Sequence, residues 1–132
     1  MSENKNYFYM RLKEGFFNSP ELIAVESMEK GYQYSNILLK MYLLSLRGEG
    51  RLMAGRIPYS PEMLSRATGH DIETVNEAIE VLKDAGLIEI LDSGAIYMLD
   101  IQNFIGKSST EADRQREYQK RIAEEKKKML EI

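Results

Sequence analysis

Residues 71–91, DIETVNEAIEVLKDAGLIEIL, constrain the fold more than any other stretch of the chain. At about 100° per residue, one face of a helix collects four aliphatic side chains: Ile72, Val75, Ile79 and Leu82. Asp71 has the chemistry of a helix N-cap, and Gly86 is placed to end the helix. Two aliphatic runs then flank Asp92-Ser93-Gly94, which is typical of a hairpin turn. The stretch therefore predicts one helix followed by a β-hairpin.

The tripeptide Ser-Pro-Glu occurs twice upstream, at residues 19–21 and 60–62. Each copy combines a capping hydroxyl, a proline suited to the first helical position and an acid near the positive end of the helix dipole. The first copy predicts a helix that reaches about Lys30, ends at Gly31 and partly buries Ile23 and Met28. The second copy predicts a short helix that ends at Gly69.

The segment 34–47 is apolar almost all round a helix, which is typical of a central buried helix or of a helix in an oligomer contact. The aromatic stretch 7–12 predicts an N-terminal strand, and residues 51–53 predict a brief second one. The order of elements favours an α+β, mostly helical fold. We expect a winged helix-turn-helix with an N-terminal strand extension and a C-terminal charged helix.

The charge of the chain is divided unevenly along its length. Residues 1–106 hold ten Lys and Arg against fifteen Asp and Glu, a net charge of −5. Residues 107–132 hold eight against six, a net charge of +2, which together give the −3 of the whole chain. We therefore expect a winged-helix domain over 1–106 and a charged, net basic helical tail or linker over 107–132.

Three segments in this order resemble the N-terminal domain of phage replisome organisers: YFYMRLKEGFF at 7–17, IPYSPEML at 57–64 and GLIEILDSGAIYML at 86–99. That domain is in turn similar to the N-terminal domain of the DnaD primosome protein. The resemblance covers most of residues 6–125 and implies a protein that binds an origin on phage DNA and helps to assemble the replication machinery. It also implies self-association. Contacts with a replicative helicase or its loader are expected in a further C-terminal region beyond Ile132.

The helix after Asp71 is a poor candidate for reading a DNA groove. The face opposite its aliphatic residues collects four acids: Glu73, Glu77, Glu80 and Asp84. Duplex DNA carries one charge per roughly 1.7 Å of its axis, so it would repel such a face. Only the flanking residues Thr74, Asn76 and Lys83 could make favourable contacts with it. The alternative interpretation is a solvated face, or one that pairs with a basic surface of a partner.

The tail offers a second candidate surface for nucleic acid. Seven cations lie within fifteen residues, and a tyrosine among them could stack on a base: Arg114, Arg116, Tyr118, Lys120, Arg121, Lys126, Lys127 and Lys128. Acidic residues between them neutralise much of this charge, so the tail could equally be a solvated helix or a linker.

Aromatic residues near the N-terminus are candidates for self-association: Tyr7, Phe8, Tyr9, Phe16 and Phe17. They could cover the helices as part of the core, or bury against a second copy of the chain, because aromatic side chains are enriched at such contacts. Their place outside the minimal winged helix favours the second interpretation.

The remaining composition bears on chemistry and location. The chain has no cysteine and one histidine, His70, so it lacks the residues of a typical zinc site or a thiol nucleophile. No glycine-rich phosphate loop or catalytic constellation is present, and we expect no enzyme activity, cofactor or metal. No apolar run approaches the roughly 20 residues of a membrane span, which favours the cytoplasm. The resemblance implies that this is the cytoplasm of a bacterial host and that the gene belongs to a phage or prophage.

These observations lead to three hypotheses. The first is a phage-type replication initiation protein whose winged-helix domain is an oligomerisation scaffold and an origin-DNA binder. The second is a winged-helix transcriptional regulator, and the third is a protein-interaction module without DNA contact. The acidic helix face favours the first and third, because a repressor normally needs its own groove-reading helix.

Overall fold

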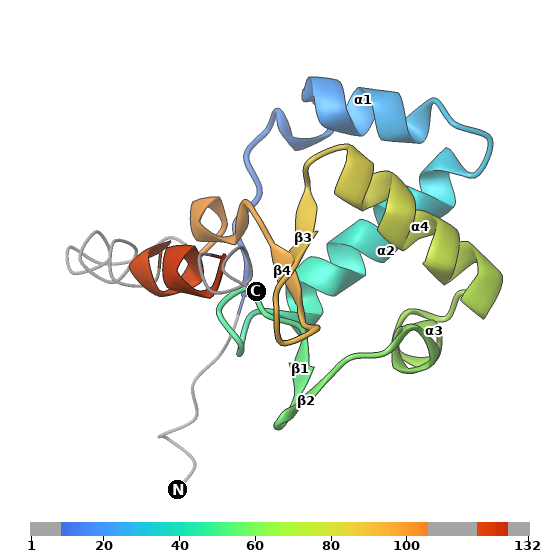
Figure 1. The fold of residues 1–132 in the computed structure, drawn as a ribbon. Helices are drawn as coiled ribbons and strands as arrows, with labels where there is room; N and C mark the ends of the chain where they lie inside the picture. The colour runs from blue at the N-terminus through green and yellow to red at the C-terminus, as the bar shows by residue number, and fades with distance from the viewer. Residues whose placement is uncertain (1–8, 106–118, 127–132) are drawn as a thin grey trace, which may run out of the picture.

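The computed structural model describes residues 9–105 and 119–126 of the chain (Figure 1). The elements in chain order are the 3-10 helix η2 (Phe16–Asn18), α1 (Pro20–Glu26), α2 (Gly31–Leu44), β1 (Met53–Ala54), β2 (Ile57–Pro58), α3 (Pro61–Thr68), α4 (Ile72–Asp84), β3 (Ile88–Ile90), β4 (Ile96–Met98) and the 3-10 helix η3 (Ile101–Asn103). A further helix covers 119–126. The predicted α+β, mostly helical fold is confirmed, and its order of elements is compatible with a winged helix.

The three helix starts predicted from capping residues are confirmed. The Ser19 hydroxyl accepts a hydrogen bond from the Leu22 amide at 3.2 Å, and the Ser60 hydroxyl accepts one from the Met63 amide at the same distance. An oxygen of the Asp71 carboxylate accepts from the Thr74 amide at 2.8 Å, and hydrogen bonding to Thr74 lowers the Asp71 pKa. Each bond satisfies an amide that has no partner inside its helix.

The predicted junction of the first two helices is wrong. Helix α1 ends at Glu26, four residues form a turn, and Gly31 begins α2 instead of ending α1. A Cβ atom on Gly31 would overlap the Glu26 backbone carbonyl, so the sharp turn between these helices requires glycine at this position. Ile23, within α1, and Met28, in the turn after it, are exposed at 53% and 44%, where partial burial was expected.

The predicted N-terminal strand is also wrong in its described part, since residues 9–12 adopt no strand. The Arg11 amide donates a hydrogen bond to the Phe104 carbonyl at 2.9 Å. Phe104 directly follows the 3-10 helix η3, which offers no extended edge on which a strand could form a ladder.

Helix α4 buries Val75 and Leu82 as predicted, but its buried face is turned toward Ala78, which was expected only at the margin. Its buried residues are Thr74, Val75, Ala78 and Leu82, while Ile79 is half-buried and Ile72 is exposed. The helix is thus turned so that the small side chain of Ala78 faces inward. Because small side chains let helices approach closely, this orientation suits the close packing of α4 on α2 and α3.

The hairpin is confirmed, and it is joined to the loop after α2. Strands β3 and β4 pair antiparallel, with Ile88 opposite Met98. An isolated bridge joins Arg51 to Tyr97, and the Leu52 amide donates to the Ile96 carbonyl at 2.9 Å. The short β1–β2 hairpin follows directly, so two small sheets lie at one end of the helices (Figure 1).

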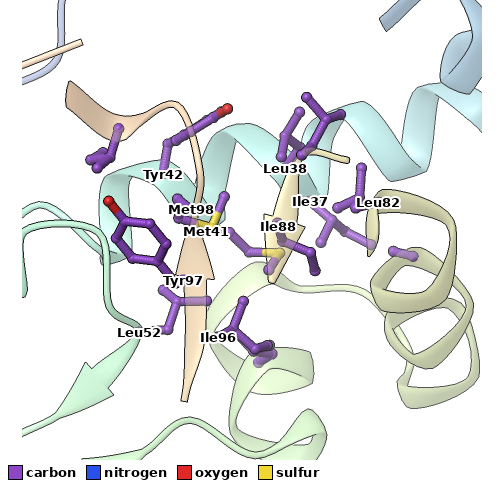
Figure 2. Close-up of a cluster of buried hydrophobic side chains, with 14 of the residues drawn as sticks. Ile37, Leu38, Met41, Tyr42, Leu52, Leu82, Ile88, Ile96, Tyr97 and Met98 are labelled. Atoms are coloured by element: carbon purple, nitrogen blue, oxygen red, sulfur yellow. The ribbon is translucent and has the colours of Figure 1, made fainter. Parts of the chain in front are cut away.

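Helix α2 is the centre of the core, as its apolar sequence predicted. Figure 2 shows its Ile37, Leu38 and Met41 facing side chains from α4 and from the β3–β4 hairpin. The fully buried large side chains are Val25, Ile37, Leu38, Met41, Tyr42, Leu52, Leu64, Leu82, Ile88, Leu91, Met98 and Ile101. Within the described part of the chain, no helix is long and apolar enough to cross a membrane.

Candidate nucleic-acid and partner surfaces

The acidic face of α4 has a partner within the chain. One oxygen of the Glu77 carboxylate accepts hydrogen bonds from the Lys30 ammonium at 2.9 Å and from the Tyr34 hydroxyl at 3.2 Å. The same ammonium lies 3.3 Å from the Thr74 hydroxyl. Lys30 comes from the turn between α1 and α2, so this polar cluster ties that corner to α4.

The protonation of this cluster suits the hydrogen bonds. The bond to Glu77 raises the pKa of Lys30, which keeps its ammonium charged. Burial, helped by the Glu77 charge, raises the pKa of Tyr34 and keeps its hydroxyl a donor. This cluster therefore stabilises the contact between the α1–α2 turn and α4. It engages Glu77, one of the four acidic residues on the helix face.

The three candidate DNA contacts on α4 have different surroundings. The Thr74 side chain is only 2% exposed and faces Lys30, which takes it off the outer surface. Asn76 is exposed. Lys83 has a partly exposed side chain, and its ammonium lies 3.5 Å from the Glu80 carboxylate one helical turn away. The outer surface of α4 therefore keeps its acidic character.

The hairpin tip carries no cation. Asp92, Ser93 and Gly94 are all exposed at the turn between β3 and β4, and Gly94 has a positive φ of 93°. That conformation favours glycine, so the turn chemistry accounts for the sequence of the tip without a nucleic-acid role.

The described part of the tail, 119–126, lies against the domain. Ile122 is 5% exposed and belongs to the main hydrophobic core. Three ion pairs accompany it: Arg121 with Glu49 at 3.5 Å, Lys126 with Glu89 at 3.4 Å, and Arg51 with Glu125. Lys120 is exposed. Five of the predicted tail residues lie outside the described residues: Arg114, Arg116, Tyr118, Lys127 and Lys128.

The aromatic residues near the N-terminus separate into two groups. Phe16 is half-buried, and its ring centroid lies 5.6 Å from that of Phe104 and 6.3 Å from that of Tyr42. Tyr9 and Phe17 are exposed. Tyr7 and Phe8 lie outside the described residues. Phe16 thus covers the core, whereas Tyr9 and Phe17 lie exposed at the surface.

Sequence reasoning missed Lys30 and Tyr34 as the residues that meet the acidic helix face. Both lie more than forty positions before Glu77, with separations of 47 and 43 residues. No local pattern marks such a contact, because it depends on how α2 packs against α4. The only sequence feature that pointed to this contact was the positive charge of Lys30 next to Gly31, a residue type that is common in turns.

The single histidine makes a contact with a neighbouring side chain. A His70 ring nitrogen lies 2.8 Å from the Asn36 side-chain oxygen, and burial lowers its pKa, with the charge of Lys40 acting in the same direction. Among the described residues, no group of three or more histidines and carboxylates is arranged to hold a metal ion.

Comparison with known proteins identifies the family of the chain. The sequence model of the N-terminal phage replisome organiser matches residues 9–127. Searches of curated proteins and of solved structures gave no match. The family match spans 119 residues (127 − 9 + 1) of the chain of 132, and it includes the capped helices, the hairpin and the docked helix described above. The chain therefore belongs to the N-terminal phage replisome organiser family, which gives it a role related to phage replication.

Proposed function

We propose that this domain is a self-associating scaffold of a phage replication-initiation complex, built as a winged helix-turn-helix. Helices α3 and α4, joined at Gly69, form the helix-turn-helix, and the β3–β4 hairpin is the wing. The bridge between Arg51 and Tyr97 supplies the third strand position that such a fold uses. The order of elements supports this architecture along the whole of 31–98.

The distribution of exposed apolar side chains carries the self-association proposal. Seven of the nine exposed large hydrophobic residues in the described chain fall within residues 9–43: Tyr9, Leu12, Phe17, Ile23, Met28, Tyr32 and Leu43. Exposed apolar side chains mark contact sites where they form a patch, and aromatic residues are enriched there, so we propose that part of this set lies in the contact between copies. The sequence prediction for self-association covered only aromatic residues near the N-terminus. The exposed Ile23 on the outer surface of α1 extends this candidate surface beyond them.

DNA contact belongs to the cationic C-terminal segment in this proposal. Helix α4 presents carboxylates outward, and the cations available on or beside its face, Lys30 and Lys83, both bind acids. A transcriptional regulator that reads a groove with α4 is less well supported for this reason. A protein-interaction module without DNA contact is the second candidate, favoured by the same acidic face.

Partners of the scaffold are other components of the phage replication machinery. The family supports partners of this kind, and we propose a replicative helicase or its loader as one of them. The described domain would hold copies of the protein together at the origin.

The test of self-association is light scattering over a concentration series with the full chain. We expect a concentration-dependent dimer, and the double variant with Ile23→Ser and Tyr32→Ser should raise the dissociation constant at least about tenfold, or about 1.4 kcal/mol. Both side chains are exposed in the monomer, so its stability should change by less than about 0.5 kcal/mol.

The matched control is Ile57→Ser, which removes a similarly exposed aliphatic side chain from β2, at the opposite end of the molecule from α1 (Figure 1). It should leave association unchanged. A strict monomer at every concentration, or an equal effect of the control, would contradict the scaffold proposal.

A further inference from the structure

A groove of about 740 Å³ opens beside the aromatic cluster, on the side of the domain where the N-terminal segment crosses η3. Its walls come from residues 13–16, from the first turn of α1 and from η3 with the residue after it. None of its lining residues belongs to α4 or to 119–126, so the groove is distinct from both described surfaces considered for DNA.

Aromatic side chains line the floor of this groove. The ring centroids of Tyr42 and Phe104 lie 4.7 Å apart, and Phe16 completes the group at 5.6 Å from Phe104. Phe16 is the half-buried member and also lines the groove. Such a floor suits a flat or aliphatic group on the ligand.

Carboxylates surround the opening of the groove. Glu14, Glu21 and Asp100 line it, against the single cation Lys13. In the part of the chain that the structure describes, none of these three acids forms an ion pair. Burial raises the pKa of Asp100, and the charge of Glu21 raises it further.

The Tyr42 hydroxyl is a second polar group of interest. Its side chain is 1% exposed and lines the groove, yet its hydroxyl makes no hydrogen bond to any described residue. Figure 2 shows the hydroxyl pointing away from Met41 and Met98. Burial and the charge of Asp100 raise its pKa, so it stays a neutral phenol that can accept or donate a hydrogen bond. The hydroxyl is not among the fully buried polar atoms of the described residues, so it is reached from the groove, where a ligand could hydrogen-bond to it.

We propose that this groove binds an arginine side chain presented by a partner protein of the replication complex. The guanidinium would meet Asp100 and Glu21, donate to the Tyr42 hydroxyl and stack on the ring of Phe16. Arginine fits better than lysine because its planar head combines several donors with a face that stacks on aromatic rings. A nucleic acid is the wrong chemistry, since its phosphates would face three carboxylates.

The inference rests on the proposed scaffold function for its choice of partner, but its test is separate. The probe is a fluorescent Ala-Leu-Arg-Leu-Ala peptide with blocked ends, titrated into the full chain, beside the same peptide with glutamine for arginine. We expect the arginine peptide to bind at least about tenfold more tightly and to shift the amide resonances of residues 13–22 and 100–104.

The variants Asp100→Asn and Glu21→Gln should each weaken the arginine peptide by about tenfold, while circular dichroism shows that both remain folded. Glu62→Gln is the matched control, because Glu62 occupies the same place after Ser-Pro in α3 that Glu21 occupies in α1, and it does not line the groove. This control should bind the peptide as the unchanged protein does.

Equal affinity for the glutamine peptide, or unchanged binding by both carboxylate variants, would overturn the proposal. Resonance shifts in the groove caused by a DNA oligonucleotide would overturn it in favour of nucleic acid. A protein that is monomeric in light scattering but still binds the arginine peptide would contradict the scaffold function and support the groove assignment. The failures of the two proposals are therefore distinguishable.

Discussion

Asp100 is a residue whose charge opposes folding of the described domain. Its pKa is raised by burial and by Glu21, so the folded state holds its proton more readily than the unfolded state does. At neutral pH the ionised carboxylate therefore costs stability, and this cost disappears as the pH falls through the raised pKa. Asp100→Asn should raise the free energy of unfolding at pH 7, and the difference from the unchanged protein should shrink as the solution is made acidic. Urea unfolding at neutral and acidic pH measures this.

Asp92→Asn is the control for this experiment, because Asp92 lies exposed at the turn of the hairpin. The difference in free energy of unfolding between this variant and the unchanged protein should vary little with pH. A variant Asp100→Asn that is less stable at neutral pH, or whose advantage persists unchanged in acid, would contradict the role assigned to burial.

At the scale of elements, the junction of α1 and α2 depends on one missing Cβ atom. Alanine is a better helix former than glycine by about 1 kcal/mol, so helix propensity alone predicts that Gly31→Ala stabilises α2. The overlap of a Cβ atom with the Glu26 carbonyl opposes this gain, and overpacking of this kind costs about 1–3 kcal/mol. We expect a net loss of stability, measured by urea unfolding.

Gly15→Ala provides the comparison. A Cβ atom on Gly15 meets nothing within 4 Å, and its φ of −90° is open to alanine. This variant should be neutral or more stable, by up to about 1 kcal/mol, because alanine restricts the unfolded chain. If both variants were equally stable, the steric account of the junction would fail.

At the scale of the whole molecule, two cations of 119–126, which we propose for DNA contact, form ion pairs with acids of the domain. The ion pairs of Arg121 and Lys126 are partly exposed, and pairs of that kind contribute about 0–1 kcal/mol each and weaken with salt. Phosphates can therefore replace Glu49 and Glu89 as partners at little cost. The small free energy of these ion pairs therefore allows the helix to dock on the domain and its cations to contact DNA.

The triple variant with Lys126→Gln, Lys127→Gln and Lys128→Gln should accordingly weaken binding of duplex DNA by the full chain. The slope of log K against log salt should become shallower by about 0.9 for each phosphate that the variant no longer neutralises. Anisotropy titrations with a labelled duplex at several salt concentrations measure both quantities.

Lys83→Gln is the matched change on α4, and it should leave DNA affinity and its salt slope unaltered, because Lys83 already lies against Glu80. If this variant weakened binding while the triple variant did not, groove reading would belong to α4 and the assignment to the tail would be wrong.

Local features of this protein were predictable from the sequence. The starts of α1, α3 and α4 followed from Ser19, Ser60 and Asp71, because a capping side chain bonds an amide three residues away. The hairpin turn at residues 92–94 and the apolar character of α2 followed in the same way from neighbouring residues. The candidate site was predictable only as a charge pattern, in the acids of α4 and the cations of the tail.

Long-range packing decided the rest. The sequence by itself determined the capped helices, the hairpin and the outward acids of α4, since these depend on contacts within a few positions. Only the tertiary structure decided that Lys30 meets Glu77, that Ile122 enters the core, and that the segment beside Phe104 forms no strand. Each of these depends on which surfaces remain uncovered once the helices have packed, and that property belongs to the assembled molecule.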